Sequence, residues 1–444
     1  MLVNVGTTYE LDTPALLVVL NVMERNIERM ARRFRAAGVG WRPHTKGLKV
    51  PQIAARLLEA GAFGVTCAKV GEAEVMANAG IRDILIANQV VGEQKIARLL
   101  SLLPRADVIV AVDSPENVDA LDRAARERDV RLRVVVEVNT GMDRAGVEPG
   151  EASIELSRYV EQKPGLHYAG LMGWEGHTVK IADPAEKRMA VRKAVGLLTA
   201  TADDCRAAGL PVEIVSCGGT GTYLITSGLS GVTEVQAGGG ILCDVVYREQ
   251  MQVEHEFAAT ILATVTSRPT PCRIICDAGK KAMSSDAAVP RPLVEGAVKS
   301  VRLSAEHAAI ELEEPRSHVA DPRPRQVPLT ADARLSSSSR GPAAGSRRRR
   351  HASVTPASYG RHASHSRRGE RHVSVMRASR QPQPPGRASR QRHASVMRAS
   401  RQPQTAGASV TSASRQRHAG VTAASCKRHA DTPFLPSAAS RARA

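Results

Sequence analysis

Short apolar strand candidates alternate with amphipathic helix candidates from residue 39 to about residue 240. This alternation limits the fold more than any other feature, because strands separated by helices form βαβ units and pair in parallel. The strand candidates are Gly40–His44, Gly64–Ala68, Asp83–Asn88, Val108–Asp113, Leu132–Asn139, Tyr168–Trp174, Glu213–Cys217 and Thr233–Ala237. Helical spacing occupies Val50–Ala60, Lys69–Ala79, Glu93–Leu103, Pro115–Arg128 and Asp183–Ala208. Eight such units in about 200 residues predict a closed (β/α)8 TIM-type barrel over residues 21–247, with an open doubly wound sheet as the alternative.

The pattern changes after residue 250 to strands without intervening helices. The candidates are Phe257–Ser267, Arg273–Asp277, Val298–Leu303 and Ala308–Glu313. An apolar segment, Pro14–Leu20, precedes the barrel, and we expect it to join these strands. The α/β barrel is therefore predicted to carry a smaller β domain made of residues 1–20 and 248–315.

Charge divides the 444-residue chain near residue 315. Residues 1–315 hold 36 Lys and Arg against 40 Asp and Glu, whereas residues 316–444 hold 26 against 4. The overall charge of +18 therefore describes neither part. The tail over residues 316–444 has few large apolar side chains, and we predict that it is disordered. It holds 25 Arg but one Lys, and Arg371–Gln383 returns with one change at Arg392–Gln404. Such composition is typical of GC-rich DNA read in another frame, so we expect a frameshift near codon 314; an evolved RNA-binding tail is the alternative.

Several classes of protein are disfavoured by the remaining composition. No apolar run approaches the roughly 20 residues that span a bilayer, and the N-terminus lacks the basic start and apolar core of a secretory signal. The seven Cys include no CxxC pair, which favours free thiols in a reducing compartment. We therefore expect a cytoplasmic protein without a membrane partner.

Two glycine-rich loops follow the seventh and eighth strand candidates. Barrels of this type often hold a phosphate group there, because glycines let backbone N–H groups approach an anion. The alternative is that both loops are tight turns. The predicted phosphate-binding residues are Ser216, Gly218, Gly219, Thr220, Gly238 and Gly239.

Lys46 follows the first strand candidate, at the predicted mouth of the barrel. Neighbouring Arg42 and His44 would lower the pKa of this amine and make it a nucleophile. A lysine facing a phosphate cradle suggests pyridoxal phosphate held as a Schiff base. Lys49 is the competing lysine, but we expect it to point away from the mouth.

Three further polar residues follow strands at the same predicted mouth. Arg144 would contact the cofactor ring or a substrate carboxylate, and its alternative is a salt bridge, for example to Asp143. His177 is a candidate acid or base because histidine titrates near neutral pH, although a lone histidine is often structural. Glu175 would either orient its neighbours or react.

Several motifs together resemble the fold-type III pyridoxal phosphate enzymes related to D-threonine aldolase, D-serine dehydratase and 3-hydroxy-D-aspartate aldolase. The segment Arg42–Lys49 is similar to the PHxKxHK signature of these enzymes, except that Leu48 stands where His is usual. The other similar segments are Thr140–Gly146, Trp174–His177, Ser216–Tyr223, Gln236–Asp244 and Asp277–Asp286. The resemblance covers residues 10–313 and implies that Lys46 carries the coenzyme, with His44 and Arg144 beside it.

Enzymes of this family also bind a divalent metal through an HxD or HxC pair, and the metal polarises the substrate hydroxyl. The resemblance stops after residue 313, and no such pair follows in its place. His429-Ala430-Asp431 has the spacing, but it lies over a hundred residues later and we interpret it as chance. We therefore assign no metal ligand to this chain and expect the β domain to be incomplete.

The sequence thus predicts a pyridoxal-phosphate lyase of β-hydroxy-D-amino acids, of the aldolase or dehydratase type, weakened by loss of the metal segment. Its substrate would be a small D-amino acid, and a homodimer is expected. An amino-acid racemase is the alternative enzyme; it commonly needs a Tyr from the partner's β domain, and no Tyr lies between Tyr247 and Tyr359. A coenzyme-binding pseudoenzyme, or an RNA-binding protein acting through its tail, is the non-catalytic alternative.

Overall fold

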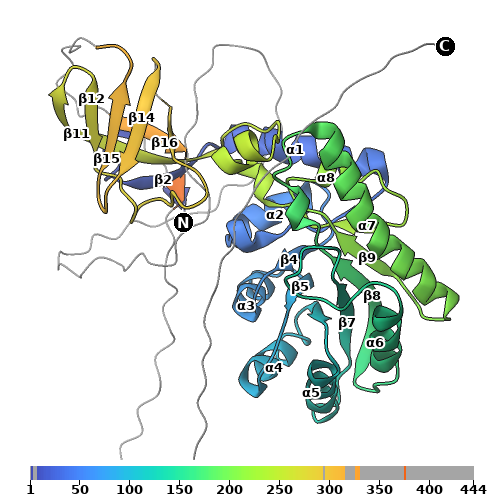
Figure 1. Cartoon of the computed structure of the whole chain (residues 1–444). Helices are drawn as coiled ribbons and strands as arrows, with labels where there is room; N and C mark the ends of the chain where they lie inside the picture. The colour runs from blue at the N-terminus through green and yellow to red at the C-terminus, as the bar shows by residue number, and fades with distance from the viewer. Residues whose placement is uncertain (1, 4–7, 294–295, 316–325, 331–374, 377–444) are drawn as a thin grey trace, which may run out of the picture. The chain divides into compact units, whose positions relative to one another are not determined.

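Eight parallel strands form a ring in the computed structural model, which describes residues 2–3, 8–293, 296–315, 326–330 and 375–376 (Figure 1). The order around the ring is β3-β10-β9-β8-β7-β6-β5-β4, and a parallel bridge between His44 and Thr66 joins β3 to β4. The strands are β3 (Gly40–Trp41), β4 (Val65–Cys67), β5 (Asp83–Gln89), β6 (Asp107–Val112), β7 (Leu132–Val138), β8 (Leu166–Gly173), β9 (Ile214–Cys217) and β10 (Glu234–Val235). The predicted barrel is confirmed, and each strand lies where the sequence pattern placed one.

Helices follow the strands around the outside of the ring. They are α1 (Leu20–Ala37), α2 (Pro51–Glu59), α3 (Val70–Asn78), α4 (Glu93–Leu100), α5 (Pro115–Arg126), α6 (Glu151–Glu161), α7 (Pro184–Ala207) and the short α8 (Tyr223–Thr226). Local signals set their ends. Asp183 caps α7 by accepting from the Glu186 amide at 2.7 Å, Pro184 occupies its first turn, and Gly38 ends α1 in the left-handed region.

Short turns of other helix types lie among these elements. They are the 3-10 turns η1 (Thr8–Glu10), η2 (Thr45–Gly47), η3 (Gly176–Thr178) and η4 (Gly239–Ile241), and the π-helix η5 (Val246–Gln250). Three of the 3-10 turns, η2, η3 and η4, directly follow strands of the barrel. No helix in the described segments is both long and apolar enough to cross a bilayer.

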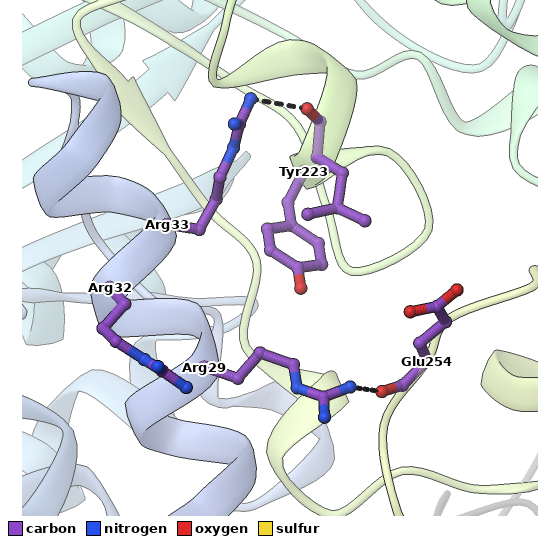
Figure 2. Close-up of a pocket in the computed structure, with 6 residues that line it drawn as sticks. Arg29, Arg32, Arg33, Tyr223 and Glu254 are labelled. Carbon is purple, nitrogen blue, oxygen red and sulfur yellow. Dashed lines mark hydrogen bonds between the residues drawn. The ribbon is translucent and has the colours of Figure 1, made fainter.

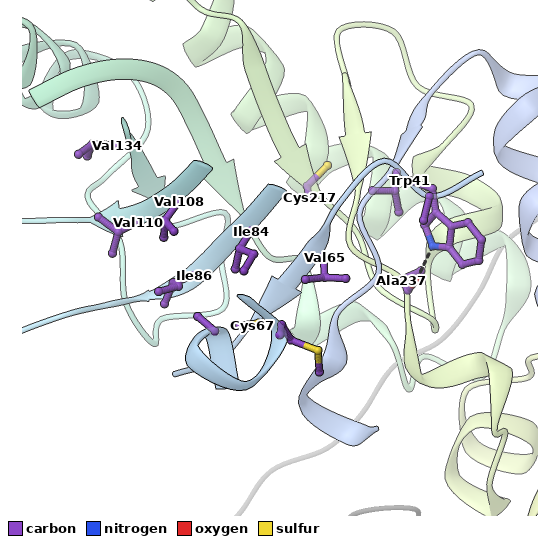
Figure 3. Packing of buried hydrophobic residues seen from close by; sticks show 14 of the residues in the cluster. Trp41, Val65, Cys67, Ile84, Ile86, Val108, Val110, Val134, Cys217 and Ala237 are labelled. Atoms are coloured by element: carbon purple, nitrogen blue, oxygen red, sulfur yellow. Dashed lines mark hydrogen bonds between the residues drawn. The ribbon is translucent and has the colours of Figure 1, made fainter. Parts of the chain in front are cut away.

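Alternating side chains along each strand build two separate apolar layers. Ile84 and Ile86 pack outward against the helices in the large cluster of Figure 3, whereas Leu85 between them faces into the barrel. The inner layer is completed by Ile109, Ala111, Val135, Ala169, Met172 and Ile214. The interior is thus filled with side chains, so polar chemistry is confined to the ends of the barrel.

A second, antiparallel sheet contains the strands without helices. They are β2 (Ala15–Val18), β11 (Ala259–Thr270), β12 (Arg273–Cys276), β13 (Arg291–Pro292), β14 (Val298–Leu303), β15 (Ala308–Leu312) and β16 (Gln326–Thr330). The N-terminal strand β2 pairs with β11, from Ala15 opposite Leu262 to Val18 opposite Ala259. A separate two-stranded ladder joins β1 (Leu2–Val3) to β17 (Val375–Met376).

The second sheet continues past residue 315, where we expected this domain to end. β16 pairs with β11 and β13, and its Val327 and Leu329 are buried with Ile261 and Ile310 in the core of this sheet. The end expected at residue 315 is therefore too early. Sequence pattern missed this strand because it is short and follows a segment of basic and proline-rich composition.

Candidate active site

Lys46 lies in the turn η2, directly beyond the C-terminal end of β3. His44 begins this turn, and its Nδ1 accepts a hydrogen bond from the Lys46 amide at 3.3 Å. The buried Thr45 donates its hydroxyl to the Thr66 carbonyl at 3.1 Å, which ties the turn to β4. The backbone of the turn is therefore fixed, while the Lys46 side chain is exposed at the mouth.

His44 stays neutral in this position. Burial lowers its pKa well below 6.5, the positive charges of Lys46 and Arg144 add to that lowering, and a hydrogen bond with the Thr66 backbone opposes it. A neutral imidazole can keep accepting from the Lys46 amide. Lys46 and His44 are joined by a hydrogen bond, and the positive charge of Arg144 acts on the same imidazole.

Arg42 does not belong to this group. Its guanidinium is buried, lies 2.9 Å from the Glu234 carboxylate and is also paired with Asp83. Glu234 and Asp83 are the first residues of β10 and β5, so the guanidinium lies toward the opposite end of the barrel. The expectation that Arg42 acts on Lys46 is therefore wrong, because its long side chain runs back to the carboxylates at the starts of β10 and β5.

Lys49, the competing lysine, is held by a carboxylate. Its ammonium lies 3.4 Å from Glu72, whose other oxygen accepts from the Ala68 amide at 2.6 Å. Lys49 stands between η2 and α2 with a positive φ of 49°. The ion pair and the backbone turn direct this side chain toward α3.

Arg144 is anchored by a buried carboxylate on the neighbouring strand. Its guanidinium lies 3.3 Å from Glu137, the penultimate residue of β7, and Glu137 also accepts from the Gln89 amide at 2.6 Å. Arg144 does form a salt bridge, but not to Asp143, whose carboxylate accepts from Asn139 at 3.0 Å. Half of the Arg144 side chain remains exposed, so a cationic group is held at the mouth with room for a ligand.

The loop that carries Arg144 is braced on both sides. The side-chain Oδ1 of Asn139 accepts from the backbone amides of Gly141 and Asp143, each at 3.1 Å, and the Gly146 amide donates to the Asp113 carboxylate at 3.1 Å. Gly141 has a φ of 104°, which disfavours other residues. A Cβ there would lie 3.3 Å from the His177 ring, so His177 lies against the Arg144 loop.

Glu175 is a positioning group for the first glycine loop. Only 1% of it is exposed, and its carboxylate accepts from the Gly218 amide at 3.2 Å and from the hydroxyls of Thr222 and Thr226, each at 2.7 Å. These three donors hold the buried carboxylate in one orientation against the loop. The alternative role that we had left open, reaction with substrate, does not fit a carboxylate enclosed in this way.

The two glycine loops, Gly218–Thr222 and Gly238–Gly240, form a cradle that excludes larger residues. A Cβ at Gly238 would lie 2.4 Å from the His44 carbonyl oxygen, one at Gly219 would lie 2.3 Å from the Trp174 ring, and one at Gly239 would lie 2.2 Å from the Tyr247 hydroxyl. The second loop thus packs on the residue that begins the Lys46 turn.

Backbone amides in this cradle remain available to an anion. The Gly218 and Gly219 amides donate within the protein, to Glu175 and to the Thr222 hydroxyl. Those of Thr220, Gly221 and Gly239 make no hydrogen bond to another residue of the described segments. Ser216 is buried beside them and accepts from the Gln236 amide at 2.9 Å. These donors fit a phosphate group, although the amides concerned are not those of Gly218 and Gly219.

Sequence reasoning missed several residues of the mouth. Tyr247 faces the second loop, Glu137 holds Arg144 and accepts from Gln89, and the Thr140 hydroxyl is buried with no hydrogen-bond partner among the residues that the structure describes. Thr140 directly precedes Gly141, and its methyl carbon lies 3.0 Å from the Cβ position of Gly173 at the end of β8. Glu137 and Gln89 could have been found, because they are polar residues at the ends of predicted strands. The sequence around Tyr247 contains no feature that would have predicted its place at the mouth.

Metal ligands are not grouped within the part of the chain that the structure describes. No set of three or more His, Cys, Asp or Glu side chains is placed to hold an ion there. The pair His429 and Asp431, considered above, lies outside the described residues.

Comparisons with known proteins match both domains. The family model of the alanine racemase N-terminal domain matches residues 18–244, and the model of a serine dehydratase domain matches residues 258–328. A D-threonine aldolase of Arthrobacter sp is 32% identical over 305 residues, 68% of this chain and 80% of that protein. D-threo-3-hydroxyaspartate dehydratase of Delftia sp. is 36% identical over 290 residues, 64% of this chain and 76% of that protein. The crystal structure of D-threonine aldolase from Filomicrobium marinum has a TM-score of 0.70 at 33% identity, covering 74% of this chain and 90% of that one.

Proposed function

Because this chain belongs to the fold-type III pyridoxal-phosphate family of the D-threonine aldolase and D-serine dehydratase-like enzymes, we propose that it is a lyase of β-hydroxy-D-amino acids. The relatives named above are an aldolase and a dehydratase, which differ in the bond that breaks: Cα–Cβ in the aldolase and Cβ–O in the dehydratase. Either substrate is a small D-amino acid with a hydroxyl on its β carbon.

The observation that carries the proposal is the position of Lys46 beside the glycine cradle. Gly238 packs against His44, which begins the Lys46 turn, so an anion-binding backbone and an amine share one mouth. The unpartnered amides of Thr220, Gly221 and Gly239 fit a phosphate group, and Lys46 would hold the coenzyme covalently. Tyr247 and Ser216 would complete the phosphate site. When bound, the coenzyme would supply an electron sink for the pair left on Cα, which comes from the Cα–Cβ bond in an aldolase and from the Cα–H bond in a dehydratase.

Arg144 and His177 are the candidates for contact with the substrate. Arg144 supplies a fixed positive charge, held by Glu137, for the coenzyme ring or the substrate carboxylate. His177 lies against the same loop and is exposed, so its imidazole is placed to carry a proton to or from a group in the mouth. His44 stays neutral and holds the Lys46 turn.

The divalent metal expected of the family has no residues to hold it among the described segments, so no step is derived through it. We propose a frameshift near codon 314; the observations against it are the family match to residue 328 and the pairing of β16 with β11, both in the printed frame. A shift of this kind would account for the absence of the HxD or HxC pair that enzymes of the family carry. Resequencing the locus tests this: a single-nucleotide difference that restores the pair supports the shift, and an unchanged frame in independent isolates removes it.

We further propose a cytoplasmic homodimer whose partners are its small substrates. The family fold and the second sheet support this arrangement, and the body over residues 1–315 is mildly acidic, which disfavours nucleic acid there. Sedimentation velocity at several protein concentrations tests the dimer.

The proposed function is tested first by attachment of the coenzyme. The purified protein incubated with pyridoxal phosphate should gain visible absorbance, lose it on borohydride reduction, and carry the adduct on the peptide that contains Lys46. Lys49→Ala is the matched control and should behave as the parent, because Lys49 pairs with Glu72. An unmodified, colourless protein, or an adduct on Lys49, would contradict the proposal.

The second test is turnover. D-threonine, D-serine and 3-hydroxy-D-aspartate are assayed with and without Mn²⁺, and D-alanine is assayed for racemisation. Cleavage or dehydration of a β-hydroxy substrate supports the lyase. Racemisation of D-alanine alone would support the racemase, and coenzyme binding without any turnover would support a pseudoenzyme.

A further inference from the structure

A second pocket lies on the other side of the first glycine loop, outside the site described above. It has a volume of about 430 Å³ and is lined by Arg29, Arg32, Arg33, Tyr223, Leu224 and Glu254 (Figure 2). The arginines come from one face of α1, and Tyr223 and Leu224 begin α8 directly after the loop Gly218–Thr222. We propose that this pocket binds a small organic phosphate and that its occupancy changes the affinity for the coenzyme.

The lining carries more positive than negative charge. Arg33 donates to neutral acceptors, the Ser227 hydroxyl at 2.9 Å and the Leu224 carbonyl at 2.7 Å, and Arg29 donates to the Glu254 carbonyl. These contacts orient the guanidinium groups without neutralising them. Of the six lining residues, only Glu254 has a carboxylate.

Arg32 is only weakly compensated from outside the pocket. It lies 3.6 Å from Glu28, and that carboxylate is already 3.0 Å from Arg35. The Glu28 carboxylate is thus shared by Arg32 and Arg35, and both arginine side chains are exposed. An excess of cationic charge in a concave site favours an anionic ligand.

The geometry favours a phosphate ester over a simple anion. Guanidinium groups present planar pairs of donors that match phosphate oxygens, and Arg29 and Arg33 are already oriented. Leu224 is 51% exposed and lines the pocket together with Tyr223, and these two apolar side chains would contact the carbon body of the ligand. A volume of about 430 Å³ is larger than a bare phosphate ion requires.

Hydrogen bonds connect the wall of this pocket to both glycine loops. The Tyr223 hydroxyl lies 3.0 Å from Nε2 of His255, and Nδ1 of His255 lies 2.7 Å from the Gly240 carbonyl. The Gly240 amide in turn donates to the Thr220 hydroxyl at 3.0 Å. A shift of Tyr223 would therefore reach both halves of the cradle.

The charges of the pocket also act on this chain of hydrogen bonds. Burial raises the pKa of Tyr223 to about 12, and Arg29 and Arg33 act against that shift. Burial lowers the pKa of His255, and Arg29 adds to the lowering. A bound phosphate would offset the Arg29 charge and so change the field at both rings.

The coupling, which rests on the proposed function, is reciprocal. If the phosphate ester changes the affinity for the coenzyme, the coenzyme must change the affinity for the ester by the same factor. We expect a factor of about five, the low end for coupled sites, because the pocket is open to solvent.

Calorimetric titration with glycerol 3-phosphate tests the pocket. The coenzyme is first fixed to the protein by borohydride reduction and the excess is removed, so that the cradle is occupied and no free phosphate ester competes for the pocket. One equivalent should bind, and the Arg29→Ala/Arg32→Ala variant should bind at least about tenfold more weakly, since charge-assisted hydrogen bonds are lost. Arg98→Ala is the matched control, because Arg98 pairs with Glu74 and neither residue lines the pocket, and it should bind as the parent does.

Three results would overturn the pocket: no binding, equal binding by the double variant, or equal affinity for sulfate. The coupling is measured separately, as the dissociation constant of the coenzyme with and without saturating glycerol 3-phosphate, and an unchanged value would overturn it. A protein that takes up no coenzyme would contradict the proposed function, while arginine-dependent binding of the ester would still support the pocket.

Discussion

Replacement of Glu175 by Gln tests whether a buried carboxylate prepares the first glycine loop for the coenzyme. The carboxylate accepts three hydrogen bonds, from the Gly218 amide and from the hydroxyls of Thr222 and Thr226. An amide offers only one acceptor oxygen. If this oxygen keeps the two hydroxyls, the amide nitrogen faces the Gly218 N–H, and two donors then oppose each other.

The magnitude follows from the bond that is lost. A hydrogen bond to a charged group contributes about 1.5–3 kcal/mol, and the Gly218 N–H is buried, so we expect the free energy of unfolding to fall by about 2–3 kcal/mol. If the loop of the free variant then leaves its bound conformation, coenzyme binding must restore it. Since about 1.4 kcal/mol corresponds to a factor of ten, the dissociation constant of the coenzyme should rise by at most about 30- to 150-fold.

The assay separates positioning from reaction. Urea denaturation gives the free energy of unfolding, absorbance titration gives coenzyme affinity, and turnover is measured at saturating coenzyme. Thr226→Val removes one of the three donors and should produce a smaller loss of the same kind. Unchanged unfolding and unchanged affinity in Glu175→Gln would refute the reasoning, and a loss of turnover with normal affinity would assign Glu175 a direct chemical role.

Three further predictions concern charge and protonation. Glu137→Gln removes the carboxylate that anchors Arg144 but keeps an acceptor oxygen for Gln89, so kcat/KM should fall about tenfold with little effect on unfolding, because the Arg144 end of the ion pair is half exposed and such pairs contribute about 1 kcal/mol or less; unchanged kinetics would contradict this. The pKa values of His44 and His255 are lowered below 6.5 in the folded protein, so the unfolded chain binds more protons in acid, and the free energy of unfolding should fall as pH drops below about 6.5. His255→Gln should flatten that dependence in denaturation curves from pH 5 to 8, and an equally steep curve would contradict the assignment. Burial raises the pKa of the Cys67 thiol to about 12, so iodoacetamide at pH 8 should modify it only after unfolding, whereas rapid alkylation of the native protein, mapped by mass spectrometry, would show that the mouth opens.

The fold could be predicted from the sequence because its signals are local. Apolar runs of four to eight residues, helical spacing between them and glycine-rich turns each depend on a few consecutive residues. The order of eight such units then leaves few ways to form a parallel sheet, so the positions of Lys46, Arg144 and His177 at one mouth followed from their places after strands.

The local sequence pattern could not predict contacts between residues that are far apart in the sequence. The partners of Arg42 are 41 and 192 positions away, and only the closed ring shows that they lie at the opposite end from Lys46. Glu175 accepts a hydrogen bond from the Gly218 amide, 43 positions away in the sequence. Only this contact shows that the Glu175 carboxylate orients the glycine loop. The strand β16 was missed because its pairing with β11, rather than its own composition, makes it a strand.

The sequence by itself thus determined the repeating units, the mouth at which polar residues gather and the family to which the motifs point. The tertiary structure alone decided which charges face each other, which glycine amides remain available to an anion, and where Arg29, Arg32 and Arg33 enclose a second pocket. The physical reason is that backbone periodicity is set by neighbouring residues. The electrostatic environment of a side chain is set instead by whatever the fold brings within a few ångströms of it.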